Sequence, residues 1–139
     1  MRVVLDTNIL VSALISRVGA TDRLYSAWKD GCFVLVTSHE QLEEFRRVTR
    51  YARVKSLIEP GAAGTLYNQL RTSEAVLEAL PTVNRSPDPG DNFLLAMAAA
   101  GAANYLVTGD KRHVLALQRH GNTHIVTARD MLKVLGIVE

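Results

Sequence analysis

The first strand candidate, Arg2-Val3-Val4-Leu5, ends directly on the carboxylate of Asp6. A helical pattern follows over residues 8–15, and short aliphatic runs continue to alternate with longer helical patterns to the end of the chain. Alternation of this kind is typical of βαβ units, in which helices join parallel strands. The opening stretch therefore predicts an α/β protein whose strands lie parallel in one sheet.

The predicted strands are short runs rich in β-branched and aliphatic residues. They cover residues 2–5, 33–37, 105–108 and 124–127, with a fifth at 82–83. The predicted helices lie between them, at residues 8–15, 21–30, 39–50, 51–58, 61–80, 91–100, 111–119 and 128–135. Residues 81–90 form the longest predicted loop, which joins two halves of one sheet.

Local signals mark several of the predicted helix ends. Ser38 and Gln41 have the spacing of a capping box, and Asp88 followed by Pro89 has the pattern of an N-cap and a first helical residue. Three glycines stand where a helix C-terminus needs a left-handed residue: Gly31, Gly101 and Gly136. These signals support the predicted boundaries.

Composition predicts one globular domain over residues 1–139. The chain is 47% hydrophobic and 22% charged, which fits neither a disordered nor a fibrous protein. The one cysteine, Cys32, cannot form an internal disulfide, which fits a reducing cytoplasm. Because it precedes the apolar residue Phe33, we expect Cys32 to be a small buried side chain. The first aliphatic run is too short for a signal peptide, and no apolar window is long enough for a membrane span, so we expect a soluble cytoplasmic protein.

Acidic side chains follow the strands at the edge where parallel α/β sheets bind ligands. Asp6 follows the first strand and Asp110 follows residues 105–108, while Asp91 opens the alanine-rich helix that leads into that strand. One glutamate on the helix after the second strand completes the group. We therefore expect four carboxylates to converge.

The helical wheel selects Glu44 among the three glutamates of that helix. The buried face is defined by three apolar residues: Leu42, Phe45 and Val48. Glu43 points away from this face, Glu40 is intermediate, and Glu44 lies at its border. A site residue must reach inward from the edge, so Glu44 is the prediction and the adjacent Glu43 is the alternative.

Carboxylates packed together repel one another, and a bound cation is the simplest way to hold four of them. All-oxygen ligands favour a hard ion, Mg²⁺ or Mn²⁺. Such an ion activates water and stabilises the charge that develops on a phosphodiester, which is nuclease chemistry. Taken singly, each acid also has a structural interpretation as a helix cap, a first-turn residue or a solvated helix residue.

Four segments carry a resemblance to a known family. They are Val3-Val4-Leu5-Asp6-Thr7-Asn8, Glu44-Phe45-Arg46-Arg47-Val48, Asp88-Pro89-Gly90-Asp91-Asn92 and Leu106-Val107-Thr108-Gly109-Asp110. In this order and spacing, the chain resembles PIN-domain proteins, and among them the VapC-like toxins of prokaryotic toxin–antitoxin pairs. The resemblance extends from Arg2 to about Leu135.

The resemblance implies a three-layer α/β/α sandwich with a central five-stranded parallel sheet, and Mg²⁺- or Mn²⁺-dependent cleavage of single-stranded RNA. Carried over by position, the catalytic and metal-binding acids are Asp6, Glu44, Asp91 and Asp110. The supporting residues are Asn8, Thr108 and Asp88. Family members often form homodimers, and the toxins are neutralised by a small antitoxin protein that covers the site.

Basic residues lie beside the predicted site. Lys111 and Arg112 follow the last of the four acids, and Arg46 and Arg50 follow the predicted glutamate on its helix. Phosphate contacts from such residues position RNA without reading its sequence. For Arg46 and Arg50, a solvated helix face is an equal alternative.

Two other functions stay open from the sequence. A haloacid-dehalogenase-like phosphatase uses a nucleophilic aspartate after its first strand together with Mg²⁺, but its motif has a second aspartate where this chain has Asn8. A non-catalytic RNA- or protein-binding module would keep the fold without the chemistry.

Overall fold

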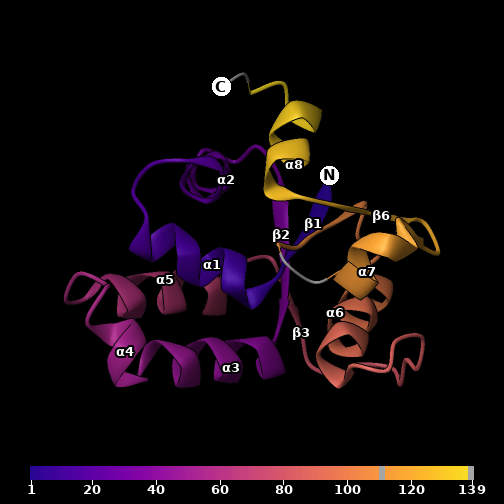
Figure 1. The fold of residues 1–139 in the computed structure, drawn as a ribbon, viewed down its shortest axis with the longest axis horizontal. Coiled ribbons are helices and arrows are strands. Elements are labelled where there is room, and N and C mark those ends of the chain that lie inside the picture. Colours follow the sequence, from indigo (N-terminus) through magenta and orange to yellow (C-terminus); the bar gives the residue numbers. More distant parts are fainter. Residues whose placement is uncertain (110–111, 138–139) are drawn as a thin grey trace.

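One mixed β-sheet lies at the centre of the computed structural model, which describes residues 1–109 and 112–137 (Figure 1). The strands are β1 (Arg2–Leu5), β2 (Val34–Ser38), β3 (Ala75–Leu77), β4 (Tyr105–Val107), β5 (Arg119–His120) and β6 (Thr123–Val126). Their order in the sheet is β3-β2-β1-β4-β6-β5. The strands β3, β2, β1, β4 and β6 run parallel, and β5 pairs antiparallel with β6 at one edge.

Helices connect the strands and cover both faces of the sheet. They are α1 (Thr7–Ile15), α2 (Ala20–Lys29), α3 (His39–Thr49), α4 (Ala52–Lys55), α5 (Ala62–Arg71), α6 (Pro89–Ala100), α7 (Arg112–Leu117) and α8 (Ala128–Val134). None of the described helices has both the length and the apolar character needed to cross a membrane.

The sheet separates two apolar cores. Successive residues of a strand point to opposite faces, so Val3 and Leu5 of β1 lie in one core and Val4 lies in the other. Side chains from α1, α2, α3, α5 and α8 fill the first core, and side chains from α6 and α7 fill the second. The predicted α/β/α sandwich is confirmed, and its sheet has an antiparallel edge strand in addition to the five parallel strands.

The predicted strands at residues 2–5, 33–37, 105–108 and 124–127 match β1, β2, β4 and β6 to within one residue. The prediction at residues 82–83 is wrong, because that segment is irregular and β3 takes the fifth parallel position. β3 lies within the helix predicted at residues 61–80. Instead α5 ends at Arg71, where the hydroxyls of Thr72 and Ser73 donate back to the carbonyls of Asn68 and Leu70.

The helix predicted to run to residue 119 also ends early. α7 stops at Leu117 because Gln118 adopts a left-handed φ of 59°, and the chain then turns at Gly121 between β5 and β6. A two-residue edge strand is too short to leave an alternating pattern, so β5 was not predicted.

The glycine predictions divide into two outcomes. Gly31 and Gly136 adopt left-handed φ values of 79° and 76°, as predicted. Gly101 does not, because its φ is −86° and the left-handed residue is Ala102 at 50°. A Cβ on Gly101 would overlap the side chain of Val36, so glycine is needed there for the close approach of α6 to β2.

The prediction that Cys32 is buried is wrong. Cys32 is exposed, in the turn between α2 and β2, where its N–H donates to the Ala27 carbonyl at 2.9 Å. The next residue, Phe33, takes the buried position and is only 5% exposed. The apolar neighbour Phe33 was therefore not a reliable sign that Cys32 itself is buried.

Candidate functional site

A narrow cleft lies at the carboxyl end of β1. Its volume is about 90 Å³, and its lining residues come from α1, α3 and α6: Asp6, Thr7, Asn8, Glu44, Val48, Gly90, Phe93 and Leu94. We call it the carboxylate cleft. It occupies the sheet edge at which parallel α/β proteins bind ligands, because α1 leaves β1 and α3 leaves β2 at this edge.

Asp6 links the end of β1 to the start of α1 and is 4% exposed. Its N–H donates to the carbonyl of Val107 in β4 at 2.9 Å. Its Oδ2 accepts from the hydroxyl of Thr108 at 2.9 Å, and its Oδ1 accepts from the N–H of Asn8 at 3.3 Å. Asp6 is therefore the N-cap of α1 and also a lining residue of the cleft, at the positive end of the helix dipole.

Glu44 enters the cleft from α3. The hydroxyl of Thr7 donates a hydrogen bond to Glu44 Oε1, so this carboxylate is oriented toward the start of α1. Its neighbour Glu43 is exposed to solvent. The structure thus brings Glu44, and not Glu43, beside Asp6.

A buried glutamine ties α3 to the end of β1. Gln41 Nε2 donates to the Leu5 carbonyl at 2.7 Å and lies 3.4 Å from Thr7 Oγ1, while Gln41 Oε1 accepts from Thr37 Oγ1 at 2.7 Å. Half of the predicted capping box forms, because Ser38 Oγ accepts from the Gln41 N–H at 3.1 Å. The Gln41 side chain goes to β1 instead of back to Ser38, so it fixes where α3 meets the cleft.

Asp91 lies in the first turn of α6 and is 1% exposed. The hydroxyl of Ser86 donates to Asp91 Oδ2 at 2.7 Å. Asn92 holds the loop before the helix, because its Oδ1 accepts from the N–H groups of Arg85 and Ser86 at 3.0 and 2.9 Å. Asp88 is exposed and caps the helix by accepting from the Gly90 N–H at 2.8 Å. Asp91 is therefore a buried residue of the helix that forms one wall of the cleft.

The structure brings two of the four predicted acids into one cleft. Asp6 and Glu44 line it, Asp91 is buried in the adjoining helix, and Asp110 lies outside the described residues. Across residues 1–109 and 112–137, no three or more His, Cys, Asp and Glu side chains form a group able to hold a metal ion. Any cation in this cleft would thus be held, among the described residues, by the pair Asp6 and Glu44.

The donor set of the cleft fits a hard divalent cation. Its side chains offer carboxylate, hydroxyl and amide oxygens, the ligand atoms that Mg²⁺ and Mn²⁺ prefer. Mg²⁺ keeps several of its waters and is usually bound by one or two carboxylates together with substrate phosphates. Two carboxylates in a narrow cleft meet that requirement without a closed cage.

Sequence reasoning found both carboxylates of the cleft and the Thr108 hydroxyl that donates to Asp6, but it missed two other hydroxyls that hold the acids. Thr7 and Ser86 were not singled out, because their partners Glu44 and Asp91 are set by tertiary contacts or by an irregular loop. For Thr7 a signal existed, since it directly follows Asp6 at the predicted ligand edge. For Ser86 we find none.

The predicted RNA-binding residues lie outside the carboxylate cleft or beyond the described side chains. Arg46 and Arg50 line a separate hollow of about 350 Å³ with Tyr67 and Asn68 of α5. The guanidinium carbon of Arg46 lies 5.5 Å from the ring centroid of Tyr67. Lys111 and the side chain of Arg112 fall outside the described part of the chain.

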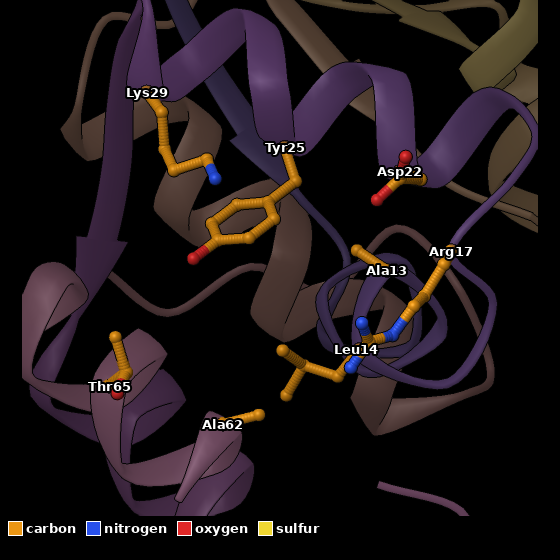
Figure 2. Close-up of a pocket in the computed structure, with 8 residues that line it drawn as sticks. All are labelled: Ala13, Leu14, Arg17, Asp22, Tyr25, Lys29, Ala62 and Thr65. Carbon is orange, nitrogen blue, oxygen red and sulfur yellow. The ribbon is translucent and has the colours of Figure 1, made fainter. Parts of the chain in front are cut away.

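A third hollow, larger than the carboxylate cleft, lies between α1, α2 and α5 (Figure 2), and we call it the α2–α5 hollow. Its volume is about 280 Å³, and it is lined by Ala13, Leu14, Arg17, Asp22, Tyr25, Lys29, Ala62 and Thr65. The Tyr25 hydroxyl donates to Gln69 Oε1 at 2.7 Å, and Lys29 Nζ lies 4.6 Å from the Tyr25 ring centroid. Burial raises the pKa of Tyr25 above its ordinary value, and the hydrogen bond with Gln69 offsets part of this rise.

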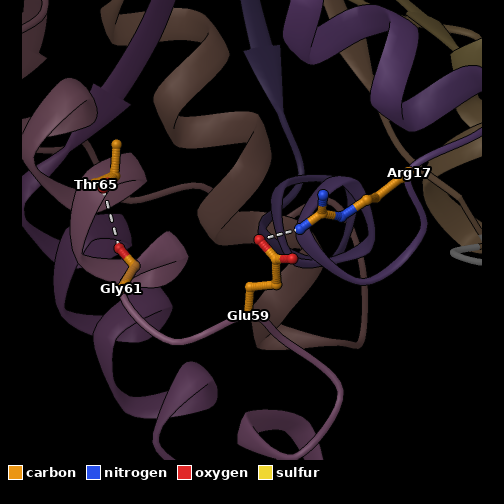
Figure 3. Close-up of polar contacts among 4 residues, drawn as sticks. All are labelled: Arg17, Glu59, Gly61 and Thr65. Atoms are coloured by element: carbon orange, nitrogen blue, oxygen red, sulfur yellow. Dashed lines mark hydrogen bonds and ion pairs between the residues drawn. The ribbon is translucent and has the colours of Figure 1, made fainter.

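Polar contacts at the rim of this hollow lie on the surface (Figure 3). Arg17 forms an ion pair with Glu59, and both side chains are more than 60% exposed. The Thr65 hydroxyl donates to the Gly61 carbonyl at 3.0 Å, within the first turn of α5. These contacts join neighbouring surface segments.

The protein is an α/β/α sandwich in which two acids, Asp6 and Glu44, line a cleft at the carboxyl end of β1. The sequence model of the PIN domain matches residues 2–112 of this chain. The chain belongs to the PIN-domain family. Searches of curated proteins and of solved structures found no significant match. PIN domains are generally nucleases, and they typically use divalent metal ions such as Mg²⁺.

Proposed function

We propose that this protein is a metal-dependent endoribonuclease that cleaves single-stranded RNA. The observation that carries the proposal is the pairing of Asp6 and Glu44 in one narrow cleft at the carboxyl end of β1. Membership of the PIN-domain family supports nuclease chemistry. A single-stranded RNA substrate is proposed from the resemblance of the chain to VapC-like proteins.

In this proposal, Mg²⁺ or Mn²⁺ is held by Asp6 and Glu44, with Asp91 and Asp110 as further acids of the same centre. When bound, the cation supplies an activated water and stabilises the negative charge that develops on the phosphodiester. The chain contributes the position of each carboxylate. Asn8, Thr108 and Asp88 are the proposed supporting residues.

Neutral hydroxyls orient each described acid of the centre. Thr108 donates to Asp6 and Ser86 donates to Asp91, while Thr7 donates to Glu44. These hydrogen bonds therefore orient the carboxylates of Asp6, Glu44 and Asp91 before a cation binds.

The same proposal covers the partners of the protein. Lys111 and Arg112 are the proposed phosphate contacts next to Asp110, and Arg46 and Arg50 are proposed contacts to a longer RNA. By resemblance to VapC-like proteins, we propose that residues 1–139 form one PIN-like domain that acts in the cytoplasm as the toxin of a toxin–antitoxin pair. A homodimer and a small antitoxin protein that covers the cleft belong to this proposal.

The test is incubation of the pure protein with single-stranded RNA and Mn²⁺, beside an Asp6→Asn variant. We expect internal cleavage by the natural protein, no cleavage with EDTA, and none by the variant. Equal cleavage by the variant would point to a contaminating nuclease. An acyl phosphate on Asp6 with a small phosphate ester would indicate a phosphatase, and RNA binding without cleavage would indicate a non-catalytic module.

A further inference from the structure

The two flanks of α3 face different hollows. Glu44 and Val48 line the carboxylate cleft, whereas Arg46 and Arg50 line the separate hollow against α5. Residues of α3 can therefore be assigned to one flank or the other from their angular position around the helix. The flank that carries Glu44 and Val48, which we call the cleft flank, is the one that an RNA strand entering the cleft would contact.

Helix geometry places Tyr51 near the cleft flank and Arg47 between the two flanks. At about 100° per residue, Arg47 lies about 60° around the helix from Glu44, and Tyr51 lies about 20° from it. Arg46 and Arg50 lie about 160° and about 120° away. Tyr51 therefore shares the side of Glu44, and Arg47 lies on the exposed face between the two flanks, about 60° from both Glu44 and Arg50.

The turn after α3 keeps Tyr51 on the side of the helix that carries Glu44. The helix ends at Thr49, but Arg50 retains right-handed helical dihedral angles of −93° and −12°. The Tyr51 N–H then donates to the carbonyl of Val48 at 3.2 Å. Tyr51 thus follows one turn beyond Val48, itself a lining residue of the cleft.

Both side chains are presented to solvent. Arg47 is exposed, and Tyr51 is 52% exposed although it is a large aromatic residue. An exposed aromatic ring beside a cation is the combination by which proteins bind single-stranded nucleic acid, because bases stack on the ring and phosphates contact the cation. The pair lies one to two helical turns from the carboxylate of Glu44.

The charged side chains of α3 and α4 suggest the direction in which a bound RNA strand would run. Glu40, one turn before Glu44, is exposed and acidic, whereas Arg53 and Lys55 on α4 are exposed and basic. α3 leads into α4 at the end away from the sheet (Figure 1). A polyanionic strand is repelled by the first end of α3 and attracted to the last, so it would leave the cleft over Arg47 toward α4.

We infer that Arg47 and Tyr51 form an RNA-binding stripe for the nucleotide next to the one in the carboxylate cleft. Arg47 contacts a phosphate and the Tyr51 ring stacks on a base. This inference rests on the proposed function, because it assumes that single-stranded RNA enters the cleft. It is separable from catalysis, because the stripe binds RNA without a metal ion.

The test measures binding of fluorescein-labelled oligouridine to the full chain by fluorescence anisotropy, in EDTA so that no cleavage occurs. We expect Tyr51→Ala to weaken binding about tenfold, and Tyr51→Phe to retain it because the ring is kept. Arg47→Ala is expected to reduce the slope of log affinity against log salt by about 0.7, the value for one phosphate contact on a single strand.

Arg71→Ala is the matched control. Arg71 is an exposed arginine in the last turn of α5, just before β3 begins, so it lies toward the opposite edge of the sheet from the cleft. This variant loses the same charge as Arg47→Ala and is expected to bind oligouridine with the affinity and salt slope of the natural protein. Circular dichroism of each variant checks that the fold is kept.

Two failures of the inference are distinguishable. If the natural protein binds oligouridine and the Arg47 and Tyr51 variants bind equally well, the stripe is wrong while the proposed function stands. A Tyr51→Ala variant with unchanged binding and an altered sedimentation coefficient would assign Tyr51 to a protein contact and likewise overturn the stripe. If the natural protein does not bind oligouridine in EDTA, the stripe fails, and the cleavage assay with Mn²⁺ tests the proposed function separately.

Discussion

The carboxylate cleft and the α2–α5 hollow differ in how they hold charge. The hollow is larger, about 280 Å³ against about 90 Å³, but its rim charges are exposed and contact one another at the surface. In the cleft, Asp6 is 4% exposed and receives hydrogen bonds from two segments of the chain. Burial of a carboxylate costs free energy unless it is hydrogen-bonded, so the hydrogen bonds to Asp6 stabilise a buried acid in the smaller cleft, where the proposed metal site lies.

The largest expected effect separates the two neighbouring glutamates. We expect Glu44→Gln to lower kcat for RNA cleavage by about a hundredfold or more, because one charged oxygen ligand of the cation is lost. Glu43→Gln is the matched control, since Glu43 directly precedes Glu44 on α3 and is exposed. Steady-state kinetics with Mn²⁺ checks both. Equal loss in the two variants would contradict the cleft geometry.

A smaller effect is expected from the hydroxyl that supports Asp6. Thr108→Val removes the 2.9 Å hydrogen bond to Asp6 Oδ2 while keeping the shape of the side chain. We expect activity to fall about tenfold and half-maximal activity to need more Mn²⁺, as for other residues that orient metal ligands. Thr108→Ser keeps the hydroxyl and should restore both values. A Thr108→Val enzyme with an unaltered Mn²⁺ requirement would count against this role.

In the α2–α5 hollow, we expect a change in stability and none in cleavage. Tyr25→Phe removes the hydrogen bond to Gln69 at 2.7 Å. The free energy of unfolding in urea should fall by about 1 kcal/mol, the usual loss for one such hydrogen bond. The kcat and KM for RNA should be unchanged. A loss of activity at full stability would make the hollow part of the active site.

The smallest effect is expected at the rim of the hollow. Arg17→Ala breaks the ion pair with Glu59, whose two side chains are 63% and 68% exposed. Exposed pairs contribute about 0 to 1 kcal/mol and are screened by salt. A double-mutant cycle with Glu59→Ala, read from urea unfolding at low and high salt, measures this coupling. A coupling well above 1 kcal/mol that resists salt would show that these charges are held as firmly as those of the cleft.

Most of the sheet could be predicted because most of its strands are short runs of adjacent aliphatic residues. The run Val3-Val4-Leu5 is aliphatic and ends on Asp6, so both the strand and the ligand edge follow from adjacent residues. β3 was missed because Ala75–Leu77 lies inside a stretch of good helix formers. Its strand conformation comes from pairing with β2, where Val36 lies opposite Ala75. Pairing of this kind is tertiary and leaves no local signal.

The site was partly predictable for the same reason. The helical wheel brings Glu44 to the edge of the buried face of α3, where the structure places it beside Thr7. The buried hydrogen bonds of Gln41 to Leu5 and Thr37 were not predictable, because they join segments separated in sequence or by a turn. The need for glycine at Gly101 was predicted from the wrong cause, since it depends on contact with Val36.

The most direct test of the account is a titration of the pure protein with Mn²⁺, followed by isothermal calorimetry and by the electron paramagnetic resonance signal of free Mn²⁺. The account predicts saturable binding that is lost in Asp6→Asn, weakened in Glu44→Gln and retained in Asp22→Asn, which changes an acid of the α2–α5 hollow. Binding that survives in Asp6→Asn, or that disappears only in Asp22→Asn, would contradict it.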